Sequence, residues 1–392
     1  MKNLETLIQE LCPDGVEFVK IGEVAKVGTG SSNRQDAVDN GKYPFYVRSK
    51  NILASDTYEF DDESIIIPGE GGIGEIFHYV KGKYALHQRV YRINFYDERI
   101  NVKFVYYYMY SCFKRFIMKK AVSATVTSIR KPMIEKFEIP LPPIEVQTEI
   151  VRILDKFTSL EVELEAELDC RKRQYEYYRD KLLSFENVGG QEVEWKKMSE
   201  VGTFIRGKRF VRTDIVEEGI PCIHYGDIYT YYGLTATKAK TYLKPEKAEK
   251  MKFASKNDVV IVGAGENNMD IGVGVAWLSD EKVAIHDACY IFKSKMNPRF
   301  VSHYLRGSNY HLQIKKYVCE GKICSISSKS IGRSLIPVPS LQEQERIATI
   351  LDRFESLTTS LQSGLPAEIA ARRQQYEHYR DKLLTFKRKG AV

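Results

Sequence analysis

The sequence has no uninterrupted apolar stretch that could cross a membrane. Its longest apolar run, around Phe104 to Phe113, is short and rich in tyrosine, whereas a membrane helix needs about 20 apolar residues. No charged segment followed by an apolar one opens the chain, so we expect no secretory signal. The seven cysteines are scattered, and the closest pair, Cys319 and Cys324, has no second pair beside it. We therefore predict reduced thiols, no zinc site and a cytoplasmic protein without a membrane partner.

Motifs of enzyme chemistry are missing as well. The chain contains no H-E-x-x-H, no G-x-S-x-G and no D/N-P-P-Y/F tetrapeptide. Gly69, Gly71 and Gly74 fit G-x-G-x-x-G, but the residues after them predict a strand where a dinucleotide site needs a helix. The segment 202–208 fits G-x-x-x-x-G-K, but Arg209 follows where a phosphate loop needs Ser or Thr. We expect turns rather than nucleotide sites, and neither a catalytic residue, a metal nor a cofactor on this chain.

The chain does have enough apolar material for folded cores and a moderate excess of positive charge. Its 392 residues, of which 43% are hydrophobic, correspond to two domains or more. The net charge of +7 permits a nucleic-acid partner without demonstrating one.

One half of the chain repeats the plan of the other. The sequence QYEYYRDKLLSF begins at Gln174 and recurs as QYEHYRDKLLTF at Gln375. The pairs IPLP/IPVP and LDKF/LDRF precede the two copies in the same order. The remaining sequence diverges, so we predict a variable globular unit, a long helix, a second variable unit and a second long helix.

Each predicted helix carries an apolar stripe. Apolar residues recur at intervals of three and four, which is typical of a coiled-coil seam. We expect the first helix to be continuous and the second to be broken near Gly364 and Pro366. The most economical cover for one stripe is the other helix. The predicted seam comprises Ile150, Ile153, Phe157, Leu160, Leu164, Ile347, Ile350, Phe354, Leu357 and Leu361.

The repeated dodecapeptide keeps its charged residues as well as its apolar ones. Packing inside the chain does not require this, so we expect a third molecule that binds both copies alike. A simple recent duplication is the alternative. The residues predicted to dock this partner are Tyr175, Tyr178, Arg179, Tyr376, Tyr379 and Arg380.

Both globular units are predicted to mix helices and strands. Segments 64–67 and 258–262 have the composition of buried strands, and a glycine-rich loop follows each of them. Helical spacing recurs after Phe104 and Phe300. His87 and His286 occupy matching positions, but nothing around them repeats as a nucleophile or an acid. We expect a structural role for both histidines rather than base contact or catalysis.

Basic and amide side chains recur in the loops expected in both units. Such side chains read base edges, and cationic ones also bind phosphate. For any one of them, an ordinary solvated surface residue is the alternative. The candidate DNA-binding residues are Arg48, Lys50, Asn51, Arg89, Arg130, Lys131, Arg206, Lys208, Arg209, Arg212, Asn267, Asn268, Lys322 and Lys329.

Taken together, these features resemble the specificity (S) subunit of a Type I restriction-modification system. The resemblance covers essentially the whole chain. It rests on LCPDGVE at residues 11–17, the helix entries IPLPP and IPVPS, the pair ILDKF and ILDRF, and the doubled YRDKLL. The globular units vary in such proteins, so their own motifs add little.

The resemblance implies an α+β fold with two α/β target recognition domains. Two long helices would separate them and pair as an antiparallel coiled coil, with pseudo-twofold symmetry. Each domain would read one half of a bipartite DNA site, and the helices would set the gap. The implied division is recognition domain 1 with a short N-terminal helix (1–143), helical spacer 1 (144–187), recognition domain 2 (188–340) and helical spacer 2 (341–392).

The resemblance also implies partners besides double-stranded DNA. Two methyltransferase subunits would dock on the helices and supply S-adenosylmethionine, and restriction subunits would bring ATP and magnesium chemistry. The chain itself would bind no cofactor and catalyse nothing. Two other hypotheses stay open: a non-enzymatic coiled-coil scaffold without DNA binding, and a fused enzyme with an unrecognised catalytic site.

Overall fold

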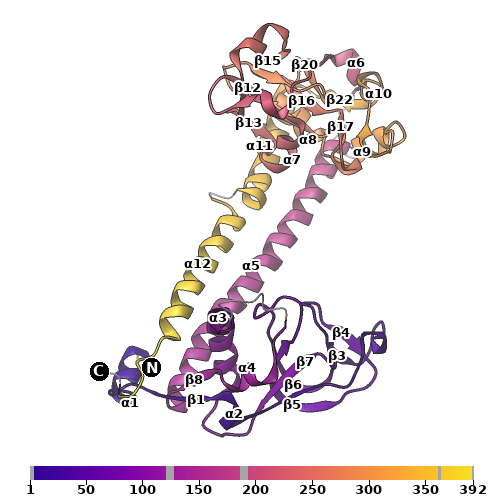
Figure 1. Cartoon of the computed structure of the whole chain (residues 1–392). Coiled ribbons are helices and arrows are strands. Elements are labelled where there is room, and N and C mark those ends of the chain that lie inside the picture. The colour runs from indigo at the N-terminus through magenta and orange to yellow at the C-terminus, as the bar shows by residue number, and fades with distance from the viewer. Residues whose placement is uncertain (1–3, 121–127, 186–192, 361–362, 391–392) are drawn as a thin grey trace. The chain divides into compact units, whose positions relative to one another are not determined.

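The computed structural model describes residues 4–120, 128–185, 193–360 and 363–390. They form two compact units (Figure 1). The first unit comprises Met1–Glu163 and Ala370–Val392, and the second comprises Leu164–Ile369. Both units mix helices with sheets, and a long helix starts in one and ends in the other. This confirms the predicted fold class of two α/β domains joined by long helices.

The first unit is built around a six-stranded sheet with the order β2-β7-β5-β6-β3-β4. Neighbouring strands are antiparallel except β3 and β6, which are parallel. Apolar residues of β5 and α3, such as Ile65 and Phe104, share the main core. The elements are α1 (Leu4–Leu11), β1 (Glu17–Lys20), α2 (Ile21–Val24), β2 (Ala25–Thr29), η1 (Arg34–Asp36), β3 (Tyr43–Tyr46), β4 (Leu53–Ser55), β5 (Phe60–Pro68), β6 (His78–Leu86), β7 (Val90–Phe95), α3 (Val102–Lys120), α4 (Lys131–Glu135) and β8 (Glu138–Leu141).

The second unit contains two five-stranded sheets, with the orders β10-β20-β16-β18-β13 and β11-β14-β12-β19-β15. Strand β12 pairs parallel with β19, as β3 does with β6 in the first unit. The elements are β9 (Trp195–Lys197), α6 (Met198–Val201), β10 (Gly202–Arg206), η2 (Arg212–Asp214), β11 (Ile215–Val216), β12 (Ile220–Ile223), α7 (Tyr225–Thr230), β13 (Thr235–Ala236), β14 (Thr241–Leu243), η3 (Pro245–Lys250), β15 (Phe253–Ala254), β16 (Val259–Val262), β17 (Ala264–Gly265), η4 (Asn268–Asp270), β18 (Gly274–Trp277), β19 (Val283–Ile285), β20 (Cys289–Ser294), α8 (Pro298–Tyr304), α9 (Ser308–Lys315), β21 (Cys324–Ser325), α10 (Ser328–Ile331) and β22 (Leu335–Pro337).

Three helices follow the globular parts: α5 (Ile144–Ser184), α11 (Leu341–Thr359) and α12 (Leu365–Leu383). Helix α5 is continuous over 41 residues, as predicted. The predicted break in the second helix is also confirmed, because α11 ends before Gly364 and α12 begins after it. A Cβ at Gly364 would lie 2.6 Å from the backbone oxygen of Ser356, so a larger residue would force the backbone to shift.

In the first unit, α12 packs antiparallel to the first half of α5. Phe157 contacts the ring of Tyr379, at 5.6 Å between centroids, whereas Glu161, one turn later, binds Arg373, which lies earlier in α12. Residues near the start of α5 and of α11 pack into the globular core of their own unit. Ile150 in the first unit and Ile347 in the second are buried among globular core residues.

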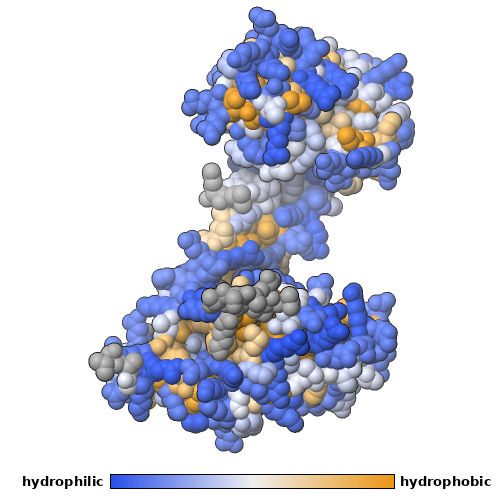
Figure 2. All heavy atoms as spheres, in the orientation of Figure 1, coloured by the Kyte–Doolittle hydropathy of each residue, from blue (hydrophilic) through white to orange (hydrophobic). Residues whose placement is uncertain are grey.

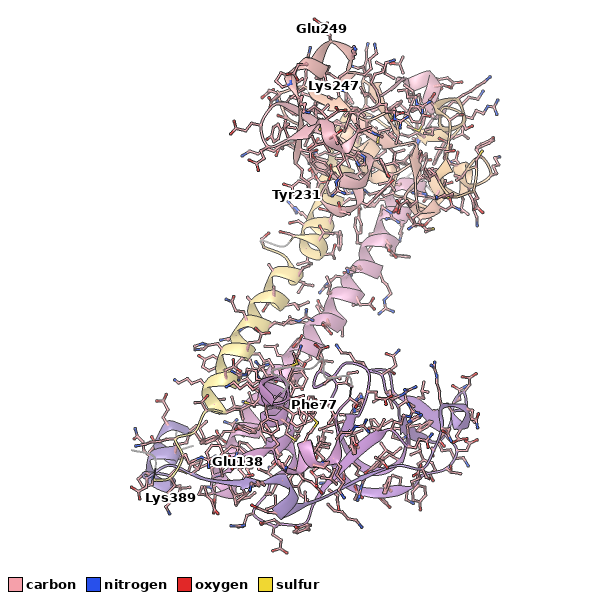
Figure 3. The ribbon with its side chains drawn as sticks, in the orientation of Figure 1. Phe77, Glu138, Tyr231, Lys247, Glu249 and Lys389 are labelled. Atoms are coloured by element: carbon pink, nitrogen blue, oxygen red, sulfur yellow. The ribbon has the colours of Figure 1, made fainter. Side chains whose placement is uncertain are left out.

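The C-terminal segment completes the first unit. The backbone N–H of Val16 donates to the carbonyl of Lys387 at 2.8 Å, and the N–H of Lys389 donates to the carbonyl of Val16 at 2.9 Å. Arg388, between these two residues, binds Glu138 of β8, and Figure 3 labels Glu138 and Lys389 in this region. Segments from both ends of the sequence therefore build one unit.

Candidate nucleic-acid interface

A histidine turn has the same geometry in both units. His87 follows β6 and His286 follows β19. The backbone N–H of His87 donates to the carbonyl of Tyr46 at 3.0 Å, and that of His286 donates to the carbonyl of Ile223 at 3.2 Å. Nδ1 of each ring accepts from the backbone N–H two residues later, at 3.0 Å in the first unit and 3.2 Å in the second. Both rings brace the turn, as a structural role requires.

A glycine loop is tied to this turn in the same way in both units. The N–H of Gly69 donates to the carbonyl of Arg89 at 3.0 Å, and that of Gly263 donates to the carbonyl of Ala288 at 2.7 Å. The carbonyls of both glycines accept in turn from a third segment, at 2.7 and 2.8 Å. These matched bonds identify equivalent positions in two units whose side chains differ.

The glycine motifs are turns and strands rather than nucleotide sites. Gly71 and Gly74 have positive φ angles of 75° and 65°, which glycine adopts at little cost. The next regular element is strand β6, so the helix that a dinucleotide site needs is not there. The second motif begins in strand β10, where a phosphate loop would follow a strand. The turn expected at the first motif is confirmed, whereas the second motif lies mostly in strand β10.

In the first unit, Glu70 holds two of the candidate DNA-binding residues together. Its Oε2 atom accepts from Nη1 of Arg48 at 3.0 Å and from Nη1 of Arg89 at 3.1 Å. The hydrogen bond from Arg89, and after it the one from Arg48, holds the pKa of the Glu70 carboxyl below its usual value. The side chains of Arg48 and Arg89 are 46% and 58% exposed, so both guanidinium groups face solvent.

A cavity of about 430 Å³ opens beside this group. The structure thus brings together Arg48, Asn51 and, through Glu70, Arg89. Sequence reasoning missed Glu70, although one acid between the glycines of a loop was a signal that could have found it. The cavity is lined by Arg34, Val47, Arg48, Ser49, Asn51, Leu53, Glu70, Gly71 and His87.

Uncharged residues occupy the equivalent positions of the second unit, and one of them, Tyr225, belongs to an aromatic cluster. The ring of His286 lies 4.6 Å from that of His224 and 4.8 Å from that of Phe210, and Tyr225 lies 4.4 Å from His224. Burial, and then the neighbouring His224, holds the pKa of His286 below its usual value, which favours neutral rings. By the matched backbone bonds, the counterparts of Arg48, Glu70 and Arg89 are Tyr225, Ala264 and Ala288.

The other candidate DNA-binding residues are spread over several loops. Hydrophilic residues cover most of both globular parts on the face drawn in Figure 2. Arg206 donates from Nε to the carbonyl of Asp287, beside the aromatic cluster, at 2.9 Å. Asn267 instead caps η4, and Asn268 binds Glu320. Apart from half-buried Asn268, all the candidates are exposed: Arg48, Lys50, Asn51, Arg89, Arg130, Lys131, Arg206, Lys208, Arg209, Arg212, Asn267, Lys322 and Lys329.

A carboxylate from the repeated LDKF/LDRF motif anchors each globular part to its helix. In the first unit, Asp155 of α5 accepts from Tyr107 at 2.6 Å and from Lys103 at 2.8 Å. In the second, Asp352 of α11 binds His303 at 2.8 Å and also pairs with Arg299. The anchor is repeated, but its partners on α3 and α8 have changed.

The residues predicted to dock a partner have matched surroundings within the chain. Tyr178 stacks on Phe354 at 5.5 Å, and Tyr379 stacks on Phe157 at 5.6 Å, with an interplanar angle of 24° in both pairs. Tyr175 and Tyr376 are half-buried against the cores, and Arg179 and Arg380 lie over their rings. Intrachain packing therefore explains part of the duplication, and partner docking stays a prediction. Tyr178 and Tyr379 keep 37% and 39% of their surface exposed.

The predicted seam differs in burial along its length. Ile153, Phe157, Leu160, Leu164, Ile350 and Phe354 are half-buried, whereas Leu357 is 38% exposed. Leu361 lies outside the described residues. Within the described ranges, no helix has the length and apolar character that crossing a membrane requires, and no His, Cys, Asp and Glu side chains gather into a potential metal site.

This arrangement defines the class of protein. The chain is a duplicated scaffold with long helices, and its two globular domains share a backbone plan but carry different surface residues. Solved structures share this fold. A chain from work on assembly and conformational transition of the type I R-M system superposes with a TM-score of 0.59 at 16% identity, covering 95% of this chain and 98% of that chain. The S subunit from M. genitalium superposes with a TM-score of 0.53 at 16% identity, covering 94% and 95%.

Sequence comparison identifies the family. The profile of the Type I restriction modification DNA specificity domain matches residues 13–169 and 191–371. The Escherichia coli EcoR124I/EcoR124II specificity subunit is 35% identical over 316 residues, which cover 76% of this chain and 74% of that protein. A putative type I restriction enzyme specificity subunit of Haemophilus influenzae is 28% identical over 98% of this chain and 100% of that protein. The chain belongs to the specificity subunits of Type I restriction-modification systems, which are DNA-recognition components and not catalytic ones.

Proposed function

We propose that each globular unit reads one half of a bipartite, asymmetric DNA site. The observation that supports this is the shared backbone frame of histidine turn and glycine loop, on which the two units carry different side chains. Different readers on a common frame would recognise different half-sites, whereas a true homodimer selects a palindrome. The exposed basic residues of both units would contact this DNA. The proposed recognition domains are 1–143 and 188–340, and the proposed spacers are 144–187 and 341–392.

We further propose that the helices set the gap between the half-sites and dock two methyltransferase subunits. Tyr178 and Tyr379 support this, because they expose nearly equal surface in matched surroundings. Two copies of one partner could therefore bind alike. The partners would supply S-adenosylmethionine, and restriction subunits with ATP and magnesium would join through the complex, with no cofactor bound by this chain.

A domain exchange tests the proposal. Residues 193–335 are replaced by the matching segment of a relative with a different target, and the complex with its methyltransferase is expressed in a host whose methylome is then sequenced. We expect a new second half-site, an unchanged first half-site and an unchanged gap. A change in both half-sites, or in neither, would contradict the assignment of one reader to each unit.

A further inference from the structure

We propose that Arg48 and Arg89, aligned by Glu70, read guanine in the first half-site, and that the equivalent positions of the second unit cannot do so. This inference rests on the proposed function of the first unit. It adds the base that is read and names Glu70 as a positioning residue.

Both guanidinium groups keep a complete donor edge free. Glu70 occupies only Nη1 of Arg48 and only Nη1 of Arg89. In the part of the chain that the structure describes, Nε and Nη2 of these two arginines make no hydrogen bond. Two neighbouring N–H groups in one plane match the O6 and N7 acceptors on the major-groove edge of guanine. Each arginine can therefore make a bidentate contact without leaving Glu70.

Arg89 is held at three points before DNA arrives. Its backbone N–H donates to Nδ1 of His87, its carbonyl accepts from Gly69, and its guanidinium binds Glu70. Gly69 and Glu70 are adjacent, so the same loop fixes the backbone and the side chain of Arg89. A side chain ordered in advance loses less conformational entropy on binding, which favours a specific contact over a diffuse one.

The shared carboxylate favours a base over a phosphate as the ligand. A phosphate beside Glu70 would face a like charge, whereas the edge of a base is neutral and repels no carboxylate. Lys208 and Arg209 of the second unit differ, because no carboxylate pairs with either of them among the described residues. Unpaired cations of that kind suit phosphate contacts.

The second unit provides an internal comparison. Its equivalents Tyr225, Ala264 and Ala288 offer neither a guanidinium nor a carboxylate. The aromatic cluster around His224 and His286 takes their place. The equivalent positions of the second unit therefore lack this pair of arginines aligned by one carboxylate, which would make the two half-sites unequal.

The test uses the complex of the full chain with its methyltransferase subunits and a DNA library in which each half-site is randomised in turn. The variants are Arg48→Ala, Arg89→Ala and Glu70→Gln. Each arginine variant should lose about 5- to 150-fold in preference for guanine at one position of the first half-site. Glu70→Gln should weaken the preference for guanine at the same positions and leave the salt dependence of binding unchanged. The second half-site should be read normally by all three, which also shows that the variants fold.

Arg99→Ala is the matched control, because Arg99 is an exposed arginine paired with Asp97 beyond the opposite end of β7. It should change neither half-site. Equal weakening on all sequences with a shallower salt slope would show phosphate contact and overturn the inference, as would unchanged preference in the variants. A wild-type complex without any sequence preference would instead overturn the proposed function, and this inference with it.

Discussion

The two globular units brace a histidine with the same backbone bonds but surround it with different chemistry. In the first unit, Glu70 and two arginines lie beside the turn. In the second, His286 packs among aromatic rings. The difference shows that the histidine and its backbone bonds are kept while the neighbouring side chains change. A duplicated chain can therefore change what one unit recognises while both units keep their fold.

The anchors to the helices show the same division between constant and variable parts. Asp155 and Asp352 stand at matching places in the repeated motif. Lysine and tyrosine contact the first carboxylate, and arginine and histidine contact the second. The second anchor is the more buried one, since His303 is fully buried. The two units should therefore respond unequally to the same change.

The largest expected effect is the loss of the second anchor. Asp352→Ala leaves buried His303 without its acceptor and Arg299 with only Glu345, which we expect to lower the free energy of unfolding of the second unit by about 2–4 kcal/mol. Asp155→Ala removes the acceptor of buried Tyr107 and of Lys103, and because the Lys103 side chain is one-third exposed and can turn to solvent, we expect a smaller cost to the first unit, about 1–2 kcal/mol. Urea unfolding followed by hydrogen exchange in each unit measures both values.

Asp169→Ala is the control for this comparison. Asp169 pairs with Arg173 on the surface of α5, and both side chains are about 70% exposed, so its loss should cost well under 1 kcal/mol. Equal costs for Asp155→Ala and Asp352→Ala would refute the claim that the second anchor is the stronger one.

Acidification should destabilise the second unit less than Asp352→Ala does, because the Asp352 carboxyl is still present. Burial holds the pKa of His303 below 6.5, and the hydrogen bond from His303 is the main cause that holds the pKa of Asp352 below 3.8, against the opposing effect of burial. Both groups bind fewer protons in the folded state, so their contribution to stability is present at neutral pH. It declines as the pH falls below 6.5 through the folded pKa of His303, and declines again below 3.8.

The first unit serves as the reference for this acid effect. Tyr107 replaces His303 at its anchor, and burial, together with the hydrogen bond to Asp155, raises the pKa of Tyr107 further above its usual value, so this ring stays neutral throughout the acid range. Hydrogen exchange in α8 and α11, which form the second anchor, should therefore accelerate on acidification before exchange in α3, which forms the first. His303→Gln, which keeps a donor without a titrating ring, should remove the step near neutral pH. An unchanged step in this variant would assign it to another group.

The sequence predicts the helices better than the interface, for a physical reason. Apolar spacing and the duplication locate α5 and the break at Gly364, because burying a stripe constrains residues close together in sequence. The arrangement of Arg48, Glu70 and Arg89 depends on a parallel strand pair and a glycine loop, which bring distant residues together. No local pattern encodes that juxtaposition. The fold also reassigns Ile150 and Ile347 from the expected seam to the cores of the units.

The smallest effect concerns the repeated tyrosines, where the two units should behave alike. Tyr178→Ala and Tyr379→Ala each remove one ring stacked on a phenylalanine with the same geometry. Each should cost about 0.5–1.5 kcal/mol of stability. If both copies also dock methyltransferase subunits, each variant should weaken one of two otherwise equal binding events in a titration. Tyr177→Ala is the control, since Tyr177 is 60% exposed and its counterpart is His378. Loss of stability without any loss of methyltransferase binding would leave packing as the reason why the dodecapeptide is repeated.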